Sequence, residues 1–158
     1  MNPYSAILID DELAAHYALG ILLKKYEHFI NVVAQSYNGK DAVEKINALK
    51  PDLIFLDIQM PDINGFEVLK QLTCQPYVVF CTAYDQYAMK AFEQNSIDYL
   101  LKPVDEVRFD QCINKIERFI ARPQMLDIYQ LTELNNLLNP RKKASAIPIN
   151  IKSKIVFV

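Results

Sequence analysis

Several features that define other protein classes are scarce in this sequence of 158 residues. It has three cysteines, Cys74, Cys81 and Cys112, at long spacings and without a CxxC pair. An odd, scattered set argues against a disulfide framework or a zinc site, and it indicates reduced thiols in a cytoplasmic protein. No apolar run approaches the ~20 residues of a membrane span. The N-terminal stretch MNPYSAILIDDE lacks a basic region and a long apolar core, so we expect no signal peptide.

An excess of charge of either sign is also absent. The 17 basic and 19 acidic side chains leave a net charge of −2. This balance argues against a body that binds nucleic acid through charge, and it gives no reason to expect a membrane surface as partner. Apolar residues make up 51% of the chain, which is typical of a globular protein with a proper core.

Short apolar runs alternate with amphipathic segments over residues 1–121. The runs are rich in β-branched and aromatic residues and cover 4–9, 30–36, 52–57, 77–82 and 96–101. Such nearly continuous runs favour parallel strands that are covered on both faces. Helical spacing follows them in 12–26, 39–49, 65–72, 85–94 and 104–121. The last of these has an apolar row of Val107, Cys112, Ile113, Ile116, Phe119 and Ile120. The pattern predicts a doubly wound α/β domain.

The tail differs in character from this domain. We predict a linker over 122–146, in which residues 123–138 can form a short helix with an apolar row of Ile128, Leu131, Leu134 and Leu138. Residues 147–158, IPINIKSKIVFV, alternate in polarity and predict a β-hairpin. A hairpin alone is marginally stable in water. It is either a frayed terminus or the start of a second, β-rich domain, and we favour the second interpretation.

Polar residues of types that bind metals or take part in catalysis follow four of the predicted strands. Asp10 and Asp11 come after the first strand, Asp57 after the third, Thr82 ends the fourth and Lys102 follows the fifth. In an open parallel sheet, functional groups gather beyond the carboxyl ends of the strands. If the first and third strands are neighbours, the three aspartates converge, with a hydroxyl and an ammonium group beside them.

Converging carboxylates repel one another unless something neutralises them. A divalent cation does so, and a site with oxygen ligands alone suits Mg²⁺, which also bridges to phosphate oxygens. Lys102 and Thr82 then complete a cradle for a phosphoryl group, and Asp57 becomes a candidate nucleophile toward phosphorus. Each residue alone has an ordinary explanation, since aspartate often caps helices. Their combination at four strand ends favours the functional interpretation.

Four motifs then place the sequence in a family. LIDDE, LIFLDIQMPDINGFEVL, VVFCTAY and IDYLLKP, in this order and spacing, make residues 4–121 resemble the receiver domain of two-component response regulators. The resemblance implies a (βα)5 flavodoxin-like fold with a parallel five-stranded sheet of order 2-1-3-4-5. It implies that Asp57 accepts a phosphoryl group from the phosphohistidine of a sensor histidine kinase. The implied Mg²⁺ ligands are Asp10, Asp11, Asp57 and the backbone carbonyl of Gln59.

The resemblance also implies a switch. Thr82 and Lys102 meet the phosphoryl group, the bond between Lys102 and Pro103 is cis, and Tyr99 turns inward. The surface of residues 85–121 then changes its packing, and a homodimer through it is the usual family outcome. Possible pairs across such a dimer are Lys90, Glu93, Asp98, Glu106 and Arg108. Gln59 and Tyr84 occupy positions that influence how fast the phosphoryl group is lost to water.

The tail suggests an output, with two alternatives left open. Residues 147–158 resemble the start of a LytTR-type DNA-binding domain, so the full-length protein would be a transcription regulator that contacts DNA only through an output domain this chain lacks. The first alternative is a stand-alone receiver that acts through protein contacts. The second is a Mg²⁺-dependent phosphohydrolase. Such enzymes commonly carry a second acid two residues after the nucleophile, and Gln59 stands there, so we expect no enzyme beyond slow loss of the chain's own phosphoryl group.

Overall fold

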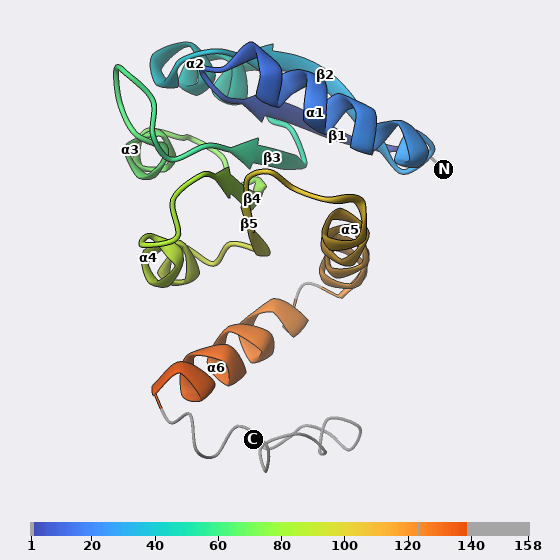
Figure 1. The fold of residues 1–158 in the computed structure, drawn as a ribbon, viewed down its shortest axis with the longest axis vertical. Helices are drawn as coiled ribbons and strands as arrows, with labels where there is room; N and C mark the ends of the chain where they lie inside the picture. The colour runs from blue at the N-terminus through green and yellow to red at the C-terminus, as the bar shows by residue number, and fades with distance from the viewer. Residues whose placement is uncertain (1, 123, 139–158) are drawn as a thin grey trace.

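The structure, a computed structural model, describes residues 2–122 and 124–138. Strands and helices alternate up to α5, and one further helix follows (Figure 1). The strands are β1 (Tyr4–Ile9), β2 (Ile30–Ser36), β3 (Leu53–Leu56), β4 (Tyr77–Thr82) and β5 (Asp98–Leu101). The helices are α1 (Leu13–Leu23), the short η1 (Lys24–Tyr26), α2 (Gly39–Leu49), α3 (Gly65–Lys70), α4 (Ala88–Glu93), α5 (Glu106–Ala121) and α6 (Gln124–Leu138).

All five strands are parallel and lie in the order β2-β1-β3-β4-β5. This confirms the predicted doubly wound, flavodoxin-like fold and its strand order. β1 pairs with β3 so that Ile9 lies opposite Leu56. The two strands therefore end side by side, which is the condition under which their trailing aspartates converge.

Two apolar cores lie on opposite faces of the sheet. Leu8 and Phe55 belong to the core beneath α1 and α5, whereas Ile9 and Leu56 belong to the core beneath α2, α3 and α4. Figure 1 shows the sheet between these two sets of helices. Every side chain of β3 is buried because helices cover it on both sides. This explains why the run LIFL has no polar alternation.

Side-chain caps fix the start of three helices near the carboxyl edge of the sheet. Asn38 accepts a hydrogen bond from the backbone of Asp41 at the start of α2. Asn64 and Asp105 do the same at α3 and α5. Such caps satisfy backbone donors that a helix leaves unpaired. The loops between strand and helix are thereby held in place where the polar residues gather.

The apolar row of the helix on 104–121 differs from its prediction at two positions. Val107 is 68% exposed, whereas Phe109, which was not in the predicted apolar row, is fully buried. Val107 lies five residues before Cys112, which is about 140° around a helix and therefore off the row. The correct row adds Phe109 to Cys112, Ile113, Ile116 and Phe119. The fourth helix is also shorter than the predicted 85–94.

Helix α6 lies within the segment expected to be a linker. Three members of its expected apolar row, Ile128, Leu131 and Leu138, are exposed. The expected hairpin at 147–158 lies outside the described residues, so the boundaries of the linker and of a further domain stay predictions.

The three cysteines are free, and Cys81 and Cys112 are buried. Burial raises the pKa of the Cys81 thiol to about 12, so this thiol is inert at neutral pH. No helix within the described residues is long and apolar enough to cross a membrane.

Candidate functional site

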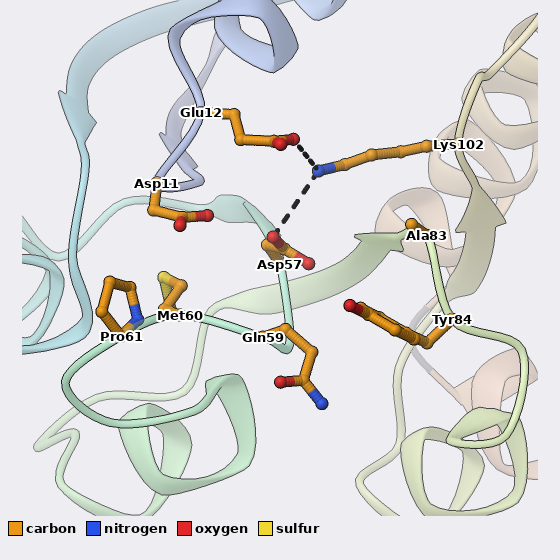
Figure 2. Close-up of a pocket in the computed structure, with 9 residues that line it drawn as sticks. All are labelled: Asp11, Glu12, Asp57, Gln59, Met60, Pro61, Ala83, Tyr84 and Lys102. Atoms are coloured by element: carbon orange, nitrogen blue, oxygen red, sulfur yellow. Dashed lines mark hydrogen bonds and ion pairs between the residues drawn. The ribbon is translucent and has the colours of Figure 1, made fainter.

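A pocket of about 380 Å³ opens where β1, β3, β4 and β5 end (Figure 2). Residues that follow these four strands line it, among them Asp11, Glu12, Asp57, Tyr84 and Lys102. The pocket thus collects side chains from four separate segments of the chain. This is the edge at which an open parallel sheet places its functional groups.

An acidic cluster forms the floor of this pocket. One carboxylate oxygen from each of Asp10, Asp11 and Asp57 lies within 4.8 Å of the others. Asp10 and Asp57 are buried, and Asp11 is exposed. The backbone N–H of Asp57 donates to the carbonyl of Ile9 at 3.0 Å, which ties the end of β3 to the end of β1. The sheet order therefore brings together the three aspartates that the sequence placed after different strands.

The position of Asp57 is fixed by its surroundings. Its side chain accepts a hydrogen bond from the backbone N–H of Ile58 at 2.8 Å. Gly65, the first residue of α3, packs against the same turn, because a Cβ atom there would lie 2.6 Å from the Asp57 carbonyl oxygen. Any side chain at Gly65 would push the turn away. The aspartate therefore sits between a rigid strand and a helix start that only glycine permits.

Lys102 is the cation that faces the cluster. Its Nζ lies 2.6 Å from Asp10 Oδ2, and 3.5 Å from both Asp57 Oδ2 and Glu12 Oε1. Figure 2 shows the lysine side chain pointing between Glu12 and Asp57. Its backbone N–H donates to the carbonyl of Thr82 at 2.9 Å. The bond between Lys102 and Pro103 is cis, as the resemblance implies.

The charges of the site are not fully compensated. Burial raises the pKa of Asp57 to about 6, and the neighbouring carboxylate of Asp10 adds to the rise. Lys102 and hydrogen bonds from Thr82 and Ile58 act in the opposite direction without cancelling it. Burial alone would lower the pKa of Lys102, but its pairing with Asp10 and Asp57 holds that pKa above the ordinary value. One ammonium group therefore does not neutralise the cluster, which leaves a net negative pocket.

Thr82 lies at the same edge but is fully buried. Its hydroxyl favours the charged form of Asp57 and also accepts a long hydrogen bond, 3.4 Å, from the backbone N–H of Tyr84. The pocket wall in front of it is formed by Ala83 and Tyr84. The structure thus brings Thr82 to Asp57 without exposing it to the pocket.

A group of polar aromatic contacts links this edge to α4 and β5. The side-chain amide of Gln59 donates to the hydroxyl of Tyr87 at 2.6 Å, just before α4 begins. The hydroxyl of Tyr99 on β5 donates to the backbone carbonyl of Tyr84. Tyr99 is only partly buried. The Gln59 side chain is thus engaged with Tyr87, and the expectation that the Gln59 backbone carbonyl binds the metal stays a prediction.

Two contributors were missed from the sequence. Glu12 pairs with Lys102 and lines the pocket, although no role was predicted for it. Its only signal was its place at the end of the first strand, next to Asp10 and Asp11. Tyr87 holds Gln59 from a loop that lies 28 residues further along the chain. No local pattern marks such a contact.

Comparison with known proteins agrees with this geometry. The family model for the response regulator receiver domain matches residues 6–114. An uncharacterized response regulatory protein of Vibrio cholerae is 51% identical over 116 residues, which are 72% of this chain and 48% of that protein. The transcriptional regulatory protein BtsR of Salmonella typhi is 41% identical over 71% of this chain and 47% of its own length. The sensory transduction protein LytT of Bacillus anthracis is 42% identical over 71% and 46% respectively.

Solved structures show the same fold. The response regulatory domain of protein mrkE from Klebsiella pneumoniae superposes with a TM-score of 0.66 at 31% identity, covering 72% of this chain and 95% of that one. The receiver domain of AraT from Geobacillus stearothermophilus gives 0.69 at 27% identity, covering 78% and 99%. The chain thus spans nearly the whole of these isolated domains but about half the length of its curated relatives. With the family model matched over most of its length, the chain belongs to the response regulator receiver domain family.

Proposed function

We propose that Asp57 of this chain accepts a phosphoryl group from a phosphohistidine of a sensor histidine kinase in the cytoplasm. Receiver domains in general are phosphoacceptors that interact with such kinases. The observation that carries the proposal is the position of Asp57 between Asp10, Asp11 and Lys102, in a pocket open to solvent. A carboxylate so placed can attack phosphorus. The new O–P bond then forms at Asp57 while the N–P bond breaks and its electron pair stays with the histidine.

Mg²⁺ fits the acidic cluster by its chemistry. The donors are three carboxylates with no nitrogen or sulfur ligand among them, which is the set that Mg²⁺ prefers. The raised pKa of Asp57 shows that negative charge remains to be compensated. Asp10, Asp11, Asp57 and the backbone carbonyl of Gln59 would hold the ion, and bound Mg²⁺ would supply charge neutralisation for the incoming phosphoryl oxygens.

The chain's own residues would do the remaining work. Lys102 is already directed at Asp57 and can exchange this carboxylate for a phosphoryl oxygen. Thr82 can donate its hydroxyl to another phosphoryl oxygen once it moves out from behind Tyr84. Such donors stabilise charge that develops during transfer. Asp57 is not accompanied by a second acid at position 59, so we infer only slow loss of the phosphoryl group and no turnover of outside substrates.

The output is a separate part of the proposal. We infer that residues 1–121 form the receiver, 122–146 a linker, and 147–158 the start of a β-rich, LytTR-like output domain that controls transcription. The name of the relative BtsR and the half-length match to the curated relatives support this reading. DNA would be bound only through the output domain. A stand-alone receiver that acts through protein contacts is the alternative.

The test of phosphorylation is direct. The chain is incubated with Mg²⁺ and acetyl phosphate, and its intact mass is compared with that of Asp57→Asn. One added phosphoryl group on the wild type, absent from the variant and absent when EDTA replaces Mg²⁺, is the expected result. A phosphoryl group that persists on the Asp57→Asn variant would refute the assignment of the acceptor. If acetyl phosphate gives no added mass, the same comparison with a phosphorylated histidine kinase decides, and no transfer there either would reject the proposal.

A further inference from the structure

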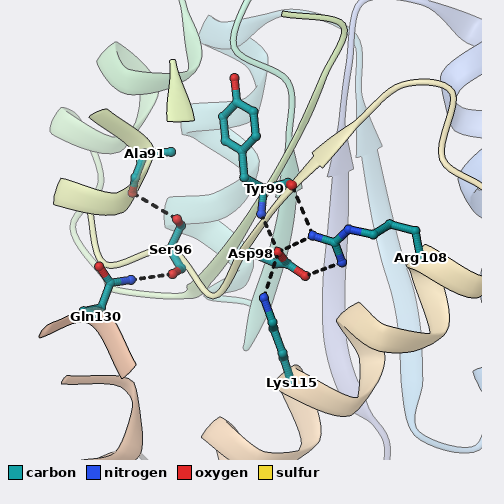
Figure 3. Close-up of polar contacts among 7 residues, drawn as sticks. All are labelled: Ala91, Ser96, Asp98, Tyr99, Arg108, Lys115 and Gln130. Atoms are coloured by element: carbon teal, nitrogen blue, oxygen red, sulfur yellow. Dashed lines mark hydrogen bonds and ion pairs between the residues drawn. The ribbon is translucent and has the colours of Figure 1, made fainter. Parts of the chain in front are cut away.

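Buried polar side chains near β5 have partners within the chain (Figure 3). Asp98 accepts two hydrogen bonds from Arg108, at 2.9 and 2.6 Å, and Lys115 Nζ lies 3.2 Å from it. Asp98 and Arg108, which were expected as possible pairs across a dimer, are thus paired with each other. The Gln130 side chain of α6 is only 8% exposed and donates to the backbone carbonyl of Ser96 at 2.8 Å. Each of these groups has a partner that explains its burial.

His16 of α1 is buried without such compensation. It is 4% exposed, and its Nε2 lies 2.8 Å from the backbone carbonyl oxygen of Asp10. Because a carbonyl oxygen only accepts hydrogen bonds, Nε2 carries a proton and donates it. The other ring nitrogen, Nδ1, is buried and has no hydrogen-bond partner among the residues that the structure describes. An unpaired buried nitrogen is unfavourable, so an apolar side chain would suit this position better if stability alone mattered.

The bond from His16 fixes the peptide group between Asp10 and Asp11. A peptide group is planar, so a fixed carbonyl also fixes the direction in which the chain continues to Asp11. Asp11 is exposed, and within the described part of the chain no hydrogen bond or ion pair holds its side chain. Its place in the acidic cluster therefore depends on the backbone, and His16 holds the backbone directly before it.

The turn between β1 and α1, residues 10–12, has few other supports. The backbone N–H of Asp10 donates to the carbonyl of Ser36 at 3.1 Å, at the end of β2. The Asp10 carboxylate accepts from the backbone N–H of Glu12 at 3.0 Å. Glu12 stands at the start of α1 but does not cap it with its side chain, unlike the capping residues of α2, α3 and α5. His16 thus steadies the turn from within α1, through a bond that uses no atom of the proposed metal site.

Tyr37, the residue after β2, covers this bond. The centre of its ring lies 4.2 Å from the centre of the His16 ring, at an angle of 37° between the planes. Tyr37 is itself 41% exposed, so it forms the outer layer over His16. Its hydroxyl donates to Gln35 Oε1 at 3.0 Å, which helps to hold the ring in this place. Water is thereby kept from the bond between His16 and Asp10, and a hydrogen bond shielded from water is stronger.

We propose that His16 is a positioning residue for the Mg²⁺ site: its Nε2–H holds the turn that presents Asp10 and Asp11, and this raises the affinity of the site for Mg²⁺. The proposal rests on the proposed function, which makes the acidic cluster a Mg²⁺ site. His16 acts through the backbone and is not itself a ligand. Without its bond the turn samples other directions, and binding of the ion then has to order it. Loss of an outer partner of metal ligands typically lowers the affinity by about 10- to 100-fold.

Two variants separate the hydrogen bond from the filling of space. His16→Phe keeps a ring against Tyr37 and lacks the donor, whereas His16→Gln keeps an N–H donor at the ε position and lacks the ring. His28→Phe makes the same change at an exposed histidine before β2 and is the matched control. Mg²⁺ is titrated into each ¹⁵N-labelled chain without a phosphodonor. The dissociation constant is taken from the amide shifts of residues 10–12 and 57–59.

We expect the dissociation constant for Mg²⁺ to rise about tenfold in His16→Phe and to stay close to that of the wild type in His16→Gln and His28→Phe. His16→Phe should melt near the wild type in EDTA, because it exchanges one unpaired buried acceptor, Nδ1, for another, the Asp10 carbonyl. Long-range ¹H–¹⁵N spectra of the wild type should show a proton on Nε2 of His16.

Unchanged Mg²⁺ affinity in His16→Phe would overturn the proposal. An equally large loss in His16→Gln or in His28→Phe would do the same, because the donor would then not be the cause. A His16→Phe chain that does not fold, or that melts far below the wild type, would assign His16 to the stability of the fold instead. A ring without a proton on Nε2 would remove the bond itself.

Failure of the proposed function gives a different result. If the wild type does not bind Mg²⁺, the proposed metal site is wrong, and the role of His16 is rejected with it. If the wild type binds Mg²⁺ and His16→Phe binds it equally well, only the role of His16 is rejected. Transfer to Asp57, followed by intact mass, is measured independently of both.

Discussion

Replacing Asp57 with asparagine should stabilise the protein in the absence of Mg²⁺. Asp57 is 5% exposed and lies in the same small pocket as Asp10 and Asp11. Its carboxylate is therefore costly to keep charged, as its raised pKa of about 6 indicates. Asparagine has nearly the same shape and no charge. The variant loses the proposed acceptor but also the repulsion.

The size of the effect follows from the pKa. A shift from 3.8 to about 6 corresponds to roughly 3 kcal/mol of unfavourable free energy in the charged folded state. Because the folded pKa is higher than the unfolded one, the folded state binds more protons between these values. Wild-type stability contributed by this group therefore increases as pH falls from about 6 to about 3.8. For a chain of 158 residues, the variant should melt about 8 °C higher at pH 7.5.

Thermal unfolding in EDTA at pH 7.5, 5 and 4 checks this. Glu44→Gln, which removes an exposed carboxylate from α2, serves as the control and should melt like the wild type. The advantage of Asp57→Asn should shrink at pH 5 and be nearly gone at pH 4. Added Mg²⁺ should stabilise the wild type more than the variant, since it binds the folded site. A variant that melts at or below the wild type at pH 7.5, or a gap that persists at pH 4, would refute this account of the charges.

Three further predictions concern other parts of the site and core. Lys102→Met leaves the buried carboxylates of Asp10 and Asp57 without their ammonium partner. Urea unfolding should show that the free energy of unfolding falls by about 3 kcal/mol at pH 7.5 and by less at pH 4. A loss that is the same at both pH values would contradict the pairing. Tyr84→Ala opens the pocket wall beside Asp57 and should speed loss of the phosphoryl group, followed by intact mass over time; an equal or slower loss would show that Tyr84 does not shield the site. Phe109→Ala should cost about 3–5 kcal/mol because its ring is fully buried, whereas Val107→Ala should stay within about 0.5 kcal/mol; similar costs for the two would contradict the observed face of α5.

The fold and the centre of the site could be predicted because their signals are local. The run LIFL is long enough to mark a fully buried strand, and Asp57 follows it directly. Sheet order then decides which strand ends meet, and the pairing of β1 with β3 brings Asp10 and Asp11 to Asp57. Residue type and place in the chain were sufficient for these positions.

Other features depend on contacts that leave no mark in the sequence. Three consecutive acids follow β1, and only the path of the chain after β5 decides that Glu12 as well as Asp10 meets Lys102. The burial of Gln130 depends on a backbone carbonyl at Ser96, and every residue of the chain offers the same kind of acceptor. Phe109 was missed for a simpler reason, because the apolar row was counted from Val107.

The division of the interior by the sheet has a consequence for engineering. Side chains of a strand alternate between the faces, so residues of the α1 and α5 core do not touch those of the α2, α3 and α4 core except through the backbone of the sheet. Each core can therefore be exchanged as a block with that of a relative without repacking the other. A hybrid receiver could take the core beneath α1 and α5 from a relative and keep the core of this chain that contains Tyr99 and lies beneath α4. The sheet would then be the boundary between the two parents.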